Sequence, residues 1–213
     1  MDCILFGSGG HAKVVIDILQ AMGTRVIGFM DDYREEDHWR GIPNLGNLKQ
    51  ANEIILNYPQ ANFLVAIGDN EIRQHIARLL ERSGAKFHTA VHPSASIGSD
   101  VTIGAGSVLM PGTIVNADSR IGEHCIVNTG GTVDHDCSLG NFVHLSPGVH
   151  LAGNVEIDDL SHIGTGASAI PGIRIGSRTI VGAGAVVIRS LPNRVTAVGC
   201  PAKIIDINNM NEE

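Results

Sequence analysis

Residues 97–187 read IGSDVTIGAGSVLMPGTIVNADSRIGEHCIVNTGGTVDHDCSLGNFVHLSPGVHLAGNVEIDDLSHIGTGASAIPGIRIGSRTIVGAGAVV and repeat with a period of six. Stepping by six from Ile97 to Val187 visits sixteen positions, and fifteen of them are Ile, Leu or Val. An unbroken hexapeptide repeat predicts a parallel β-helix. The position after each aliphatic residue is most often Gly, Asn or Asp, and we interpret these as residues that tolerate a left-handed backbone.

Three hexads make one coil of 18 residues, so side chains 18 apart should stack inside a triangular prism of about five coils. The expected ladder down one interior corner is Ile103, Ile121, Leu139, Ile157 and Ile175. Such an interior excludes water, so the five histidines of this region should lie on its outer surface. They are His124, His135, His144, His150 and His162. Beyond the stacking of His144 on His162 nothing suggests three converging ligands, and no metal is expected.

The first 92 residues predict a small α/β domain with a Rossmann-like parallel sheet. Apolar runs indicate strands over 3–6, 25–30, 62–67 and 86–91, and helical patterns cover 14–22, 48–56 and 71–82. The polar stretch 33–47 reads as a loop. The expected fold class is therefore an α/β domain over 1–92 followed by a left-handed parallel β-helix and tail over 93–213.

Gly7-x-Gly9-x-x-Ala12 follows the first strand, and Asp31 and Asp32 follow the second. This pattern matches a dinucleotide fingerprint, in which backbone amides at a helix start hold a diphosphate. A complete nicotinamide site uses two mononucleotide halves, and this domain has room for one. Half a site suits a nucleotide-sugar, although a nicotinamide-binding domain, or a purely structural module trimerised by the prism, stays as an alternative.

Charge and cysteine usage exclude several other classes. The 213 residues hold 15 Lys and Arg against 22 Asp and Glu, and a net charge of −7 argues against nucleic-acid or anionic-membrane binding. No apolar run approaches the length of a membrane span. The four cysteines have no C-x-x-C spacing, which fits a reducing compartment and a cytoplasmic protein.

His135-Asp136 is the sharpest pair for catalysis, because an imidazole beside a carboxylate is a general base near neutral pH. Cys137 follows them, but it occupies a hexad position expected to point inward. We therefore interpret Cys137 as a core thiol, which favours direct transfer without a covalent acyl-enzyme.

Several segments together resemble the bacterial nucleotide-aminosugar N-acetyltransferases of the bacillosamine and perosamine type. They are GSGGHAKVVIDIL (7–19), FMDD (29–32), AIGDN (66–70), VDHDC (133–137), HLSPGVHLAGNV (144–155), GTGAS (164–168) and VGCPAK (198–203). The sialic acid O-acetyltransferases share these segments. The resemblance spans nearly the whole chain and implies a homotrimer that binds acetyl-CoA between neighbouring prisms and a nucleotide-sugar on the N-terminal domain.

The resemblance also implies roles for single residues. His135 matches the catalytic base and Asp136 its acidic partner, which is usually Glu in the family. His144 matches a residue beside the thioester, and Gly153, 18 residues after His135, could offer its N–H to the oxyanion. Thr165 and Ala183 match positions along the CoA arm, and Lys203 a partner for a CoA phosphate. In the N-terminal domain the implied substrate contacts are Gly9, Gly10 and His11 for the diphosphate-sugar, Asp31 and Asp32 for the nucleoside, and Gly68 at the third strand end.

The predicted activity is acetyl-CoA-dependent N-acetylation of a nucleotide-linked amino sugar, such as a 4-amino-4,6-dideoxyhexose. The first alternative is O-acetylation of a sugar of the sialic acid type. A prism filled by aliphatic side chains has no closed pocket of its own, so a second copy should complete the site. A threefold ring with heterologous contacts supplies three such sites.

Overall fold

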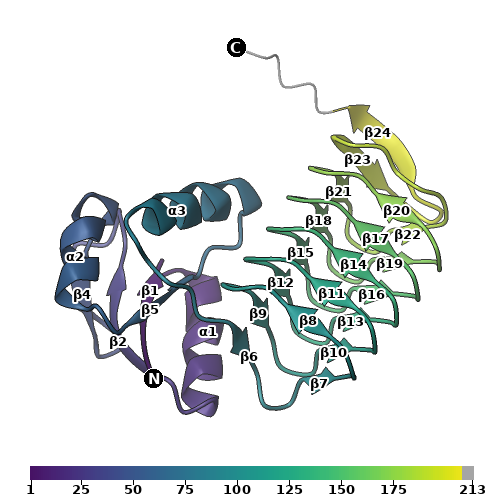
Figure 1. The fold of residues 1–213 in the computed structure, drawn as a ribbon. Helices are drawn as coiled ribbons and strands as arrows, with labels where there is room; N and C mark the ends of the chain where they lie inside the picture. Colours follow the sequence, from purple (N-terminus) through teal and green to yellow (C-terminus); the bar gives the residue numbers. More distant parts are fainter. Residues whose placement is uncertain (208–213) are drawn as a thin grey trace.

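The computed structural model describes residues 1–207 and has two parts that lie side by side (Figure 1). The N-terminal part has a five-stranded sheet in the order β3-β4-β2-β1-β5. The second part is a β-helix of short parallel strands. Both parts of the predicted fold class are confirmed.

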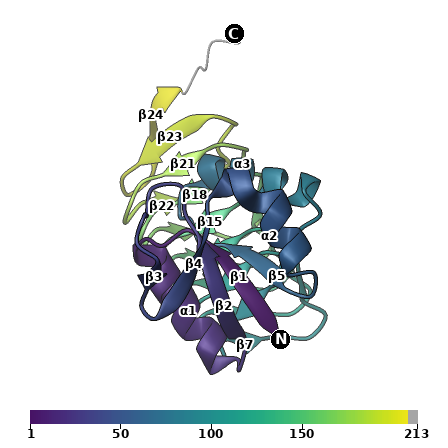
Figure 2. The same ribbon diagram turned by 90° about the vertical axis from the view of Figure 1, so that its left-hand side faces the viewer.

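The N-terminal sheet has helices on both faces. Its strands are β1 (Asp2–Phe6), β2 (Arg25–Met30), β3 (His38–Trp39), β4 (Ile42–Gly46) and β5 (Asn62–Val65), and its helices are α1 (Gly10–Ala21), α2 (Ala51–Asn57) and α3 (Asn70–Arg82), with a 3-10 turn at Leu48–Gln50. Helix α1 lies between one face of the sheet and the β-helix, and its apolar side chains pack against β1. Helices α2 and α3 cover the other face of the sheet. Figure 2 views this domain in front of the β-helix.

Two expectations for this domain were wrong. Residues 33–47 are not only loop, because β4 pairs in parallel with β2, and β3 pairs antiparallel with β4. Both strands are short, β3 is the outermost strand of the sheet, and Pro43 of β4 weakens the alternating pattern. The stretch 86–91 is not one strand: Phe87 bridges Phe63 in β5, whereas β6 (Ala90–Val91) is already the first strand of the β-helix and pairs with β9.

The β-helix has three faces, named here in chain order. Face A holds β6, β9 (Val108–Leu109), β12 (Ile126–Val127), β15 (His144–Leu145), β18 (His162–Ile163), β21 (Ile180–Val181), β23 (Val195–Val198) and β24 (Lys203–Ile207). Face B holds β7 (Ser96–Ile97), β10 (Ile114–Val115), β13 (Thr132–Val133), β16 (His150–Leu151), β19 (Ser168–Ala169) and β22 (Val186–Val187). Face C holds β8 (Thr102–Ile103), β11 (Arg120–Ile121), β14 (Ser138–Leu139), β17 (Glu156–Ile157) and β20 (Arg174–Ile175).

Pairing on each face joins residues 18 apart, as the predicted coil length requires. On face C the expected aliphatic ladder is present, since Ile121 pairs with Ile103 and Leu139, and Ile157 with Leu139 and Ile175. These side chains belong to one core cluster that runs along the prism. The last two strands described depart from the pattern: β23 pairs with β21 across 16 residues, and β24 turns back and pairs antiparallel with β23.

The left-handed residues fall three positions after each aliphatic residue, not directly after it as expected. Positive φ angles recur every six residues from Asp100 to Gly184. The glycines directly after the aliphatic residue serve the close approach of coils: a Cβ on Gly122 would lie 2.5 Å from the carbonyl oxygen of Gly140 in the next coil. Glycine therefore serves two separate purposes in the repeat: a left-handed backbone at one position and the close approach of neighbouring coils at another.

The described residues contain no helix that is both long enough and apolar enough to cross a membrane.

The two glycine requirements can be separated by substitution. Gly122→Ala places a Cβ against backbone of the next coil, and we expect it to destabilise the fold by ~3 kcal/mol through overpacking. Gly130→Ala meets open space and only imposes a φ of 66° on alanine, at a cost of about 1 kcal/mol. Thermal unfolding followed by circular dichroism compares the two variants. Equal destabilisation, or a larger loss for Gly130→Ala, would contradict this account.

Candidate functional site

A cavity of about 900 Å³ opens at the carboxyl ends of β1, β2 and β5 in the N-terminal domain. This edge of an open parallel sheet is where ligands bind in such folds. The glycine-rich loop 7–10 and the start of α1 form one wall, and α3 forms the other. The lining includes every N-terminal residue singled out from the sequence, namely Gly9, Gly10, His11, Asp31, Asp32 and Gly68.

The first turn of α1 is suited to an anion. Gly9 is the N-cap in an extended conformation, no side chain caps the helix, and its first turn carries no acidic residue. Gly9 and Gly10 line the cavity, and a Cβ on either would meet nothing within 4 Å, so the loop is open to a ligand at these positions. These uncapped amides and the helix dipole can hold phosphate oxygens.

Asp31 braces the glycine-rich loop against β2. Its Oδ2 accepts hydrogen bonds from the backbone N of Ser8 at 2.8 Å and from the Ser8 hydroxyl at 2.7 Å, and its Oδ1 accepts one from the N of Tyr33. Partial burial raises the pKa of Asp31, but these hydrogen bonds outweigh it and hold the pKa below its usual value. Asp32 Oδ1 accepts from the N of Leu48. The nucleoside contacts of both carboxylates stay a prediction, and the structure adds a bracing role for Asp31.

His11 and His144 meet where the cavity approaches face A. His144 Nδ1 lies 3.1 Å from the carbonyl oxygen of Gly68, and its Nε2 lies 3.3 Å from the amide of Asn128. The Nε2 atom of His11 is buried without a hydrogen-bond partner in the protein. Burial first, then nearby positive charge, lowers the pKa of His11 to about 4 and of His144 to about 3. Both imidazoles are neutral at pH 7, so neither can neutralise a phosphate.

The histidines of face A lie outside the prism core, but they are not all exposed. His144 stacks on His162 with ring centroids 4.6 Å apart, and His124 stacks on Phe142 at 4.9 Å. His124 and His144 are buried because the N-terminal domain covers them. Within residues 1–207, no group of three His, Cys, Asp or Glu side chains converges as metal ligands would.

His135 and Asp136 form an exposed pair at the corner between faces B and C. His135 Nδ1 lies 2.8 Å from Asp136 Oδ2, so the carboxylate fixes the tautomer that leaves Nε2 free to accept a proton. The hydrogen bond to Asp136, followed by the charge of Asp134, raises the pKa of His135 above its ordinary value of 6.5. Asp136 thus contacts the imidazole of His135 even though its side chain is shorter than the glutamate that the resemblance leads us to expect.

Gly153 lies against the His135 ring one coil further on. A Cβ at Gly153 would come within 2.6 Å of the His135 Cε1 and Nε2 atoms, so only glycine lets the ring occupy this position. Cys137 is buried, and its Sγ donates to the carbonyl oxygen of Ala152. Burial raises the pKa of the Cys137 thiol. The predicted core thiol is confirmed, whereas an oxyanion contact from Gly153 stays a prediction.

Thr165 and Ala183 are exposed and stack one coil apart at the corner between faces A and B, where Gly184 N donates to Thr165 O. Lys203 is exposed on β24. Their contacts with CoA also stay predictions.

The structure separates the two halves of the predicted site within one chain. The nucleotide cavity and His144 belong to face A, because His144 bonds Gly68 of the cavity wall. His135 lies at the B–C corner, which is the corner of the triangle opposite face A. One chain therefore brings His11, Gly68 and His144 together but does not bring them to His135.

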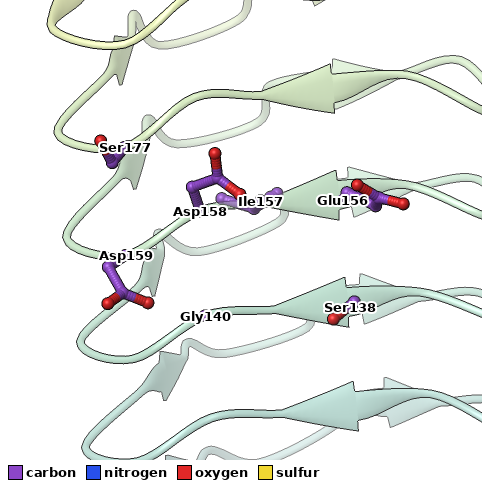
Figure 3. Close-up of a pocket in the computed structure, with 7 residues that line it drawn as sticks. All are labelled: Ser138, Gly140, Glu156, Ile157, Asp158, Asp159 and Ser177. Carbon is purple, nitrogen blue, oxygen red and sulfur yellow. The ribbon is translucent and has the colours of Figure 1, made fainter.

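A second hollow lies on face C and has a different character. It measures about 340 Å³, and Figure 3 shows its lining residues spread over neighbouring coils. Three of them are the carboxylates of Glu156, Asp158 and Asp159, of which Asp158 pairs with Arg174. Such a surface repels the anionic phosphates of a nucleotide or CoA.

Sequence reasoning missed Asn70 and Arg73, the residues that join α3 to the β-helix. Arg73 is fully buried, and its guanidinium donates to the carbonyl oxygens of His124 and Phe142. Asn70 donates to the carbonyl of Leu160. A signal was present: positions 124, 142 and 160 have positive φ, and carry bulky residues where most other coils have Gly, Asn or Asp.

Comparison with known protein families supports both halves of the chain. Residues 2–80 match the family model "PglD N-terminal domain", and residues 94–129 match "Bacterial transferase hexapeptide (six repeats)". Among curated proteins, the chain is 43% identical over 107 residues to UDP-N-acetylbacillosamine N-acetyltransferase from Bacillus subtilis. That alignment covers 50% of this chain and spans about half the length of the relative.

Solved structures align over the whole chain. A variant of perosamine N-acetyltransferase from Caulobacter crescentus, in complex with CoA and GDP-perosamine, is 42% identical with a TM-score of 0.93 and covers 97% of each chain. The acetyltransferase domain of PglB from Neisseria gonorrhoeae is 38% identical with a TM-score of 0.89, over 96% of this chain and 99% of that one. The same domain is known in complex with acetyl coenzyme A. The chain therefore belongs to the family of hexapeptide-repeat nucleotide-aminosugar N-acetyltransferases.

Proposed function

We propose that this protein transfers the acetyl group of acetyl-CoA to the amine of a nucleotide-linked amino sugar, such as a 4-amino-4,6-dideoxyhexose. The observation that carries the proposal is the exposed His135–Asp136 pair, whose 2.8 Å contact prepares a general base. The relatives with CoA and GDP-perosamine bound support both substrates.

The chemistry moves one proton from the amine to the departing thiolate by way of His135 and needs no covalent enzyme intermediate. The neutral amine attacks the thioester carbonyl, and His135 Nε2 takes the proton that the amine loses. The tetrahedral intermediate collapses, the C–S bond breaks, and the proton on His135 Nε2 passes to the departing sulfur, so that CoA leaves as a thiol. Asp136 holds Nδ1–H of the imidazolium throughout, and the N–H of Gly153 faces the developing oxyanion.

The N-terminal cavity binds the nucleotide-sugar in this proposal. Gly9 and Gly10 offer backbone amides to the diphosphate, and His11 lines the cavity beside them. Asp32 and Tyr33 stand where the nucleoside would extend, and Tyr33 is 95% exposed. The preference for a nucleotide-linked sugar over a free sugar rests on this cavity.

A homotrimer completes the site, because His135 and the cavity lie on opposite sides of each prism. The outer surfaces of faces B and C differ in polarity. Face B exposes Ile114, and Ile170 and Ile188 lie exposed just after its strands, whereas the outward residues of face C are polar or charged. Face B is thus the better surface for self-association. One edge of face B is the corner with Thr165 and Ala183, where the CoA arm would lie, with Lys203 placed to contact a CoA phosphate. The other edge is the corner with His135.

We place the enzyme in the cytoplasm and assign it no metal. The four cysteines are free thiols, and this suits a reducing compartment. Acetyl-CoA is its co-substrate, and neither nucleic acid nor a membrane is a partner in this proposal.

The first test removes the base. His135→Asn should lower kcat by about 10²–10⁴-fold on an amino nucleotide-sugar with acetyl-CoA, since the proton acceptor is lost while packing against Gly153 is kept. His38→Asn, an exposed histidine on β3, is the matched control and should match the unmodified protein. Thiol release with product mass spectrometry measures both. A His135→Asn kcat within a few-fold of the unmodified enzyme would remove His135 from the mechanism.

The same assay, run with nucleotide-linked 4-amino sugars, free amino sugars and free sialic acid, decides the acceptor. Turnover confined to the free sugars, or an O-acetyl product, would overturn the proposed acceptor.

The second test uses the pH dependence of kcat/KM. His135 acts as a base only when unprotonated, and its pKa is raised, so activity should fall as the pH drops through a value above about 6.5. Asp136→Asn removes the largest cause of that shift and should move this limb to lower pH, with a reduced maximal rate. Glu156→Gln on face C is the control with an unchanged profile. An identical acid limb in Asp136→Asn and the unmodified enzyme would contradict the assigned role of Asp136.

A further inference from the structure

The contact between α3 and the β-helix is made by a cation without a carboxylate partner. All three nitrogens of the Arg73 guanidinium donate to neutral oxygens: Nε to His124 O at 2.8 Å, Nη1 to Ile67 O and Gly68 O at 3.0 Å, and Nη2 to Asn70 Oδ1 at 2.8 Å and Phe142 O at 3.0 Å. These five bonds use the five donors of the planar fork. An ammonium group could not reproduce this geometry.

The acceptors of Arg73 come from two sides. Ile67 and Gly68 lie just after β5 and line the nucleotide cavity, whereas the carbonyls of His124 and Phe142 stand one coil apart at the C–A corner. Asn70 extends the same contact to a third coil through its bonds to Leu160 O and Ser161 O. The cavity wall and the β-helix are thus bonded to one buried side chain.

Further contacts reinforce this corner. Glu71 of α3 forms an ion pair with Arg178, which occupies the next coil of the same column. Gly68 O accepts from Arg73 and also lies within hydrogen-bond distance of His144 Nδ1. The segment after β5, which lines the cavity at Gly68, is therefore fixed from both sides.

We propose that Arg73 is a positioning residue for acetyl transfer: it sets the placement of the nucleotide cavity on the β-helix, and with it the distance from the bound sugar to a neighbouring chain's His135. The inference rests on the proposed function. Small displacements matter because a misplacement of about 1 Å can cost about 10²-fold in rate. In the proposed site the loop 7–10, the start of α1 and Asp32 hold the diphosphate and nucleoside, and Arg73 makes none of its five hydrogen bonds to these segments.

Arg73→Lys and Arg73→Met test the proposal, with Arg78→Gln, an exposed arginine of the same helix, as the control. We expect kcat, corrected for the folded fraction, to fall about 10²-fold in both variants, since neither side chain keeps the fork. The Kd of the nucleotide-sugar, measured by calorimetry, should change less than about threefold, and the control should change neither quantity. A kcat of Arg73→Lys within about twofold of the unmodified enzyme overturns the proposal, and so does a loss of nucleotide-sugar affinity that accounts for the whole effect.

A readout without turnover keeps this test separate from the proposed function. Amide hydrogen exchange of 66–82 should be faster in Arg73→Lys and Asn70→Ala than in the unmodified protein, while exchange of 10–21 in α1 stays the same. If Arg73→Met does not fold, Arg73→Lys and Asn70→Ala supply the comparison. If exchange becomes faster in the variants but the unmodified protein acetylates no amino sugar, the proposed function is rejected, while the role of Arg73 in fixing α3 on the β-helix is kept. Unchanged exchange with unchanged kcat would reject the positioning role alone.

Discussion

The buried guanidinium of Arg73 bonds the two parts of this molecule to each other, beside apolar clusters that also span the junction. Burial lowers its pKa to about 10, which still leaves it charged at neutral pH, and five hydrogen bonds to neutral oxygens replace the water that it lost. Its charge also keeps neighbouring imidazoles neutral: after burial, it is the next cause of the lowered pKa of His11 and His124. Neutral imidazoles can pack and stack at this junction, where a cluster of imidazolium ions would repel one another.

Placement of the N-terminal domain on face A and the C–A corner decides how a site can form. His135 lies at the opposite corner, exposed and supported by Asp136 and Gly153. The prism interior between them is filled by aliphatic side chains, so substrate cannot pass through it. In the proposed trimer, the cavity of one chain meets the histidine of another, so the cavity needs a fixed position on its own β-helix.

Much of this was predictable from the chain. The hexapeptide period predicted the coil length and the stacked ladder of Ile121 and Leu139, because each repeat must bury the same face. The glycine-rich loop and Asp31 predicted the edge of the sheet where the cavity lies. The strands within 33–47 were missed, since edge pairing leaves little periodic signal. The split of 86–91 was missed because an apolar run does not reveal which sheet it joins.

The contact between α3 and the β-helix could not be predicted from sequence periodicity. Asn70 and Arg73 look like ordinary polar residues of an amphipathic helix, and only tertiary contact shows that Arg73 is buried. The indirect signal was Phe142 and Leu160 in left-handed turns, where bulky side chains cost about 1–2 kcal/mol each unless something packs on them. His135 and Asp136 could be paired from sequence because adjacent residues need no fold to meet.

The most direct measurement of the central claim is the activity of mixed trimers. His135→Ala removes the base, and Gly10→Trp fills the cavity mouth at a position where a Cβ meets nothing within 4 Å. Each parent should be inactive. An equal mixture, unfolded and reassembled together, should recover about a quarter of the unmodified activity, because mixed trimers pair one intact cavity with one intact His135 of a neighbour. Verified mixed trimers that recover no activity would place both halves of the site in one chain and contradict the account.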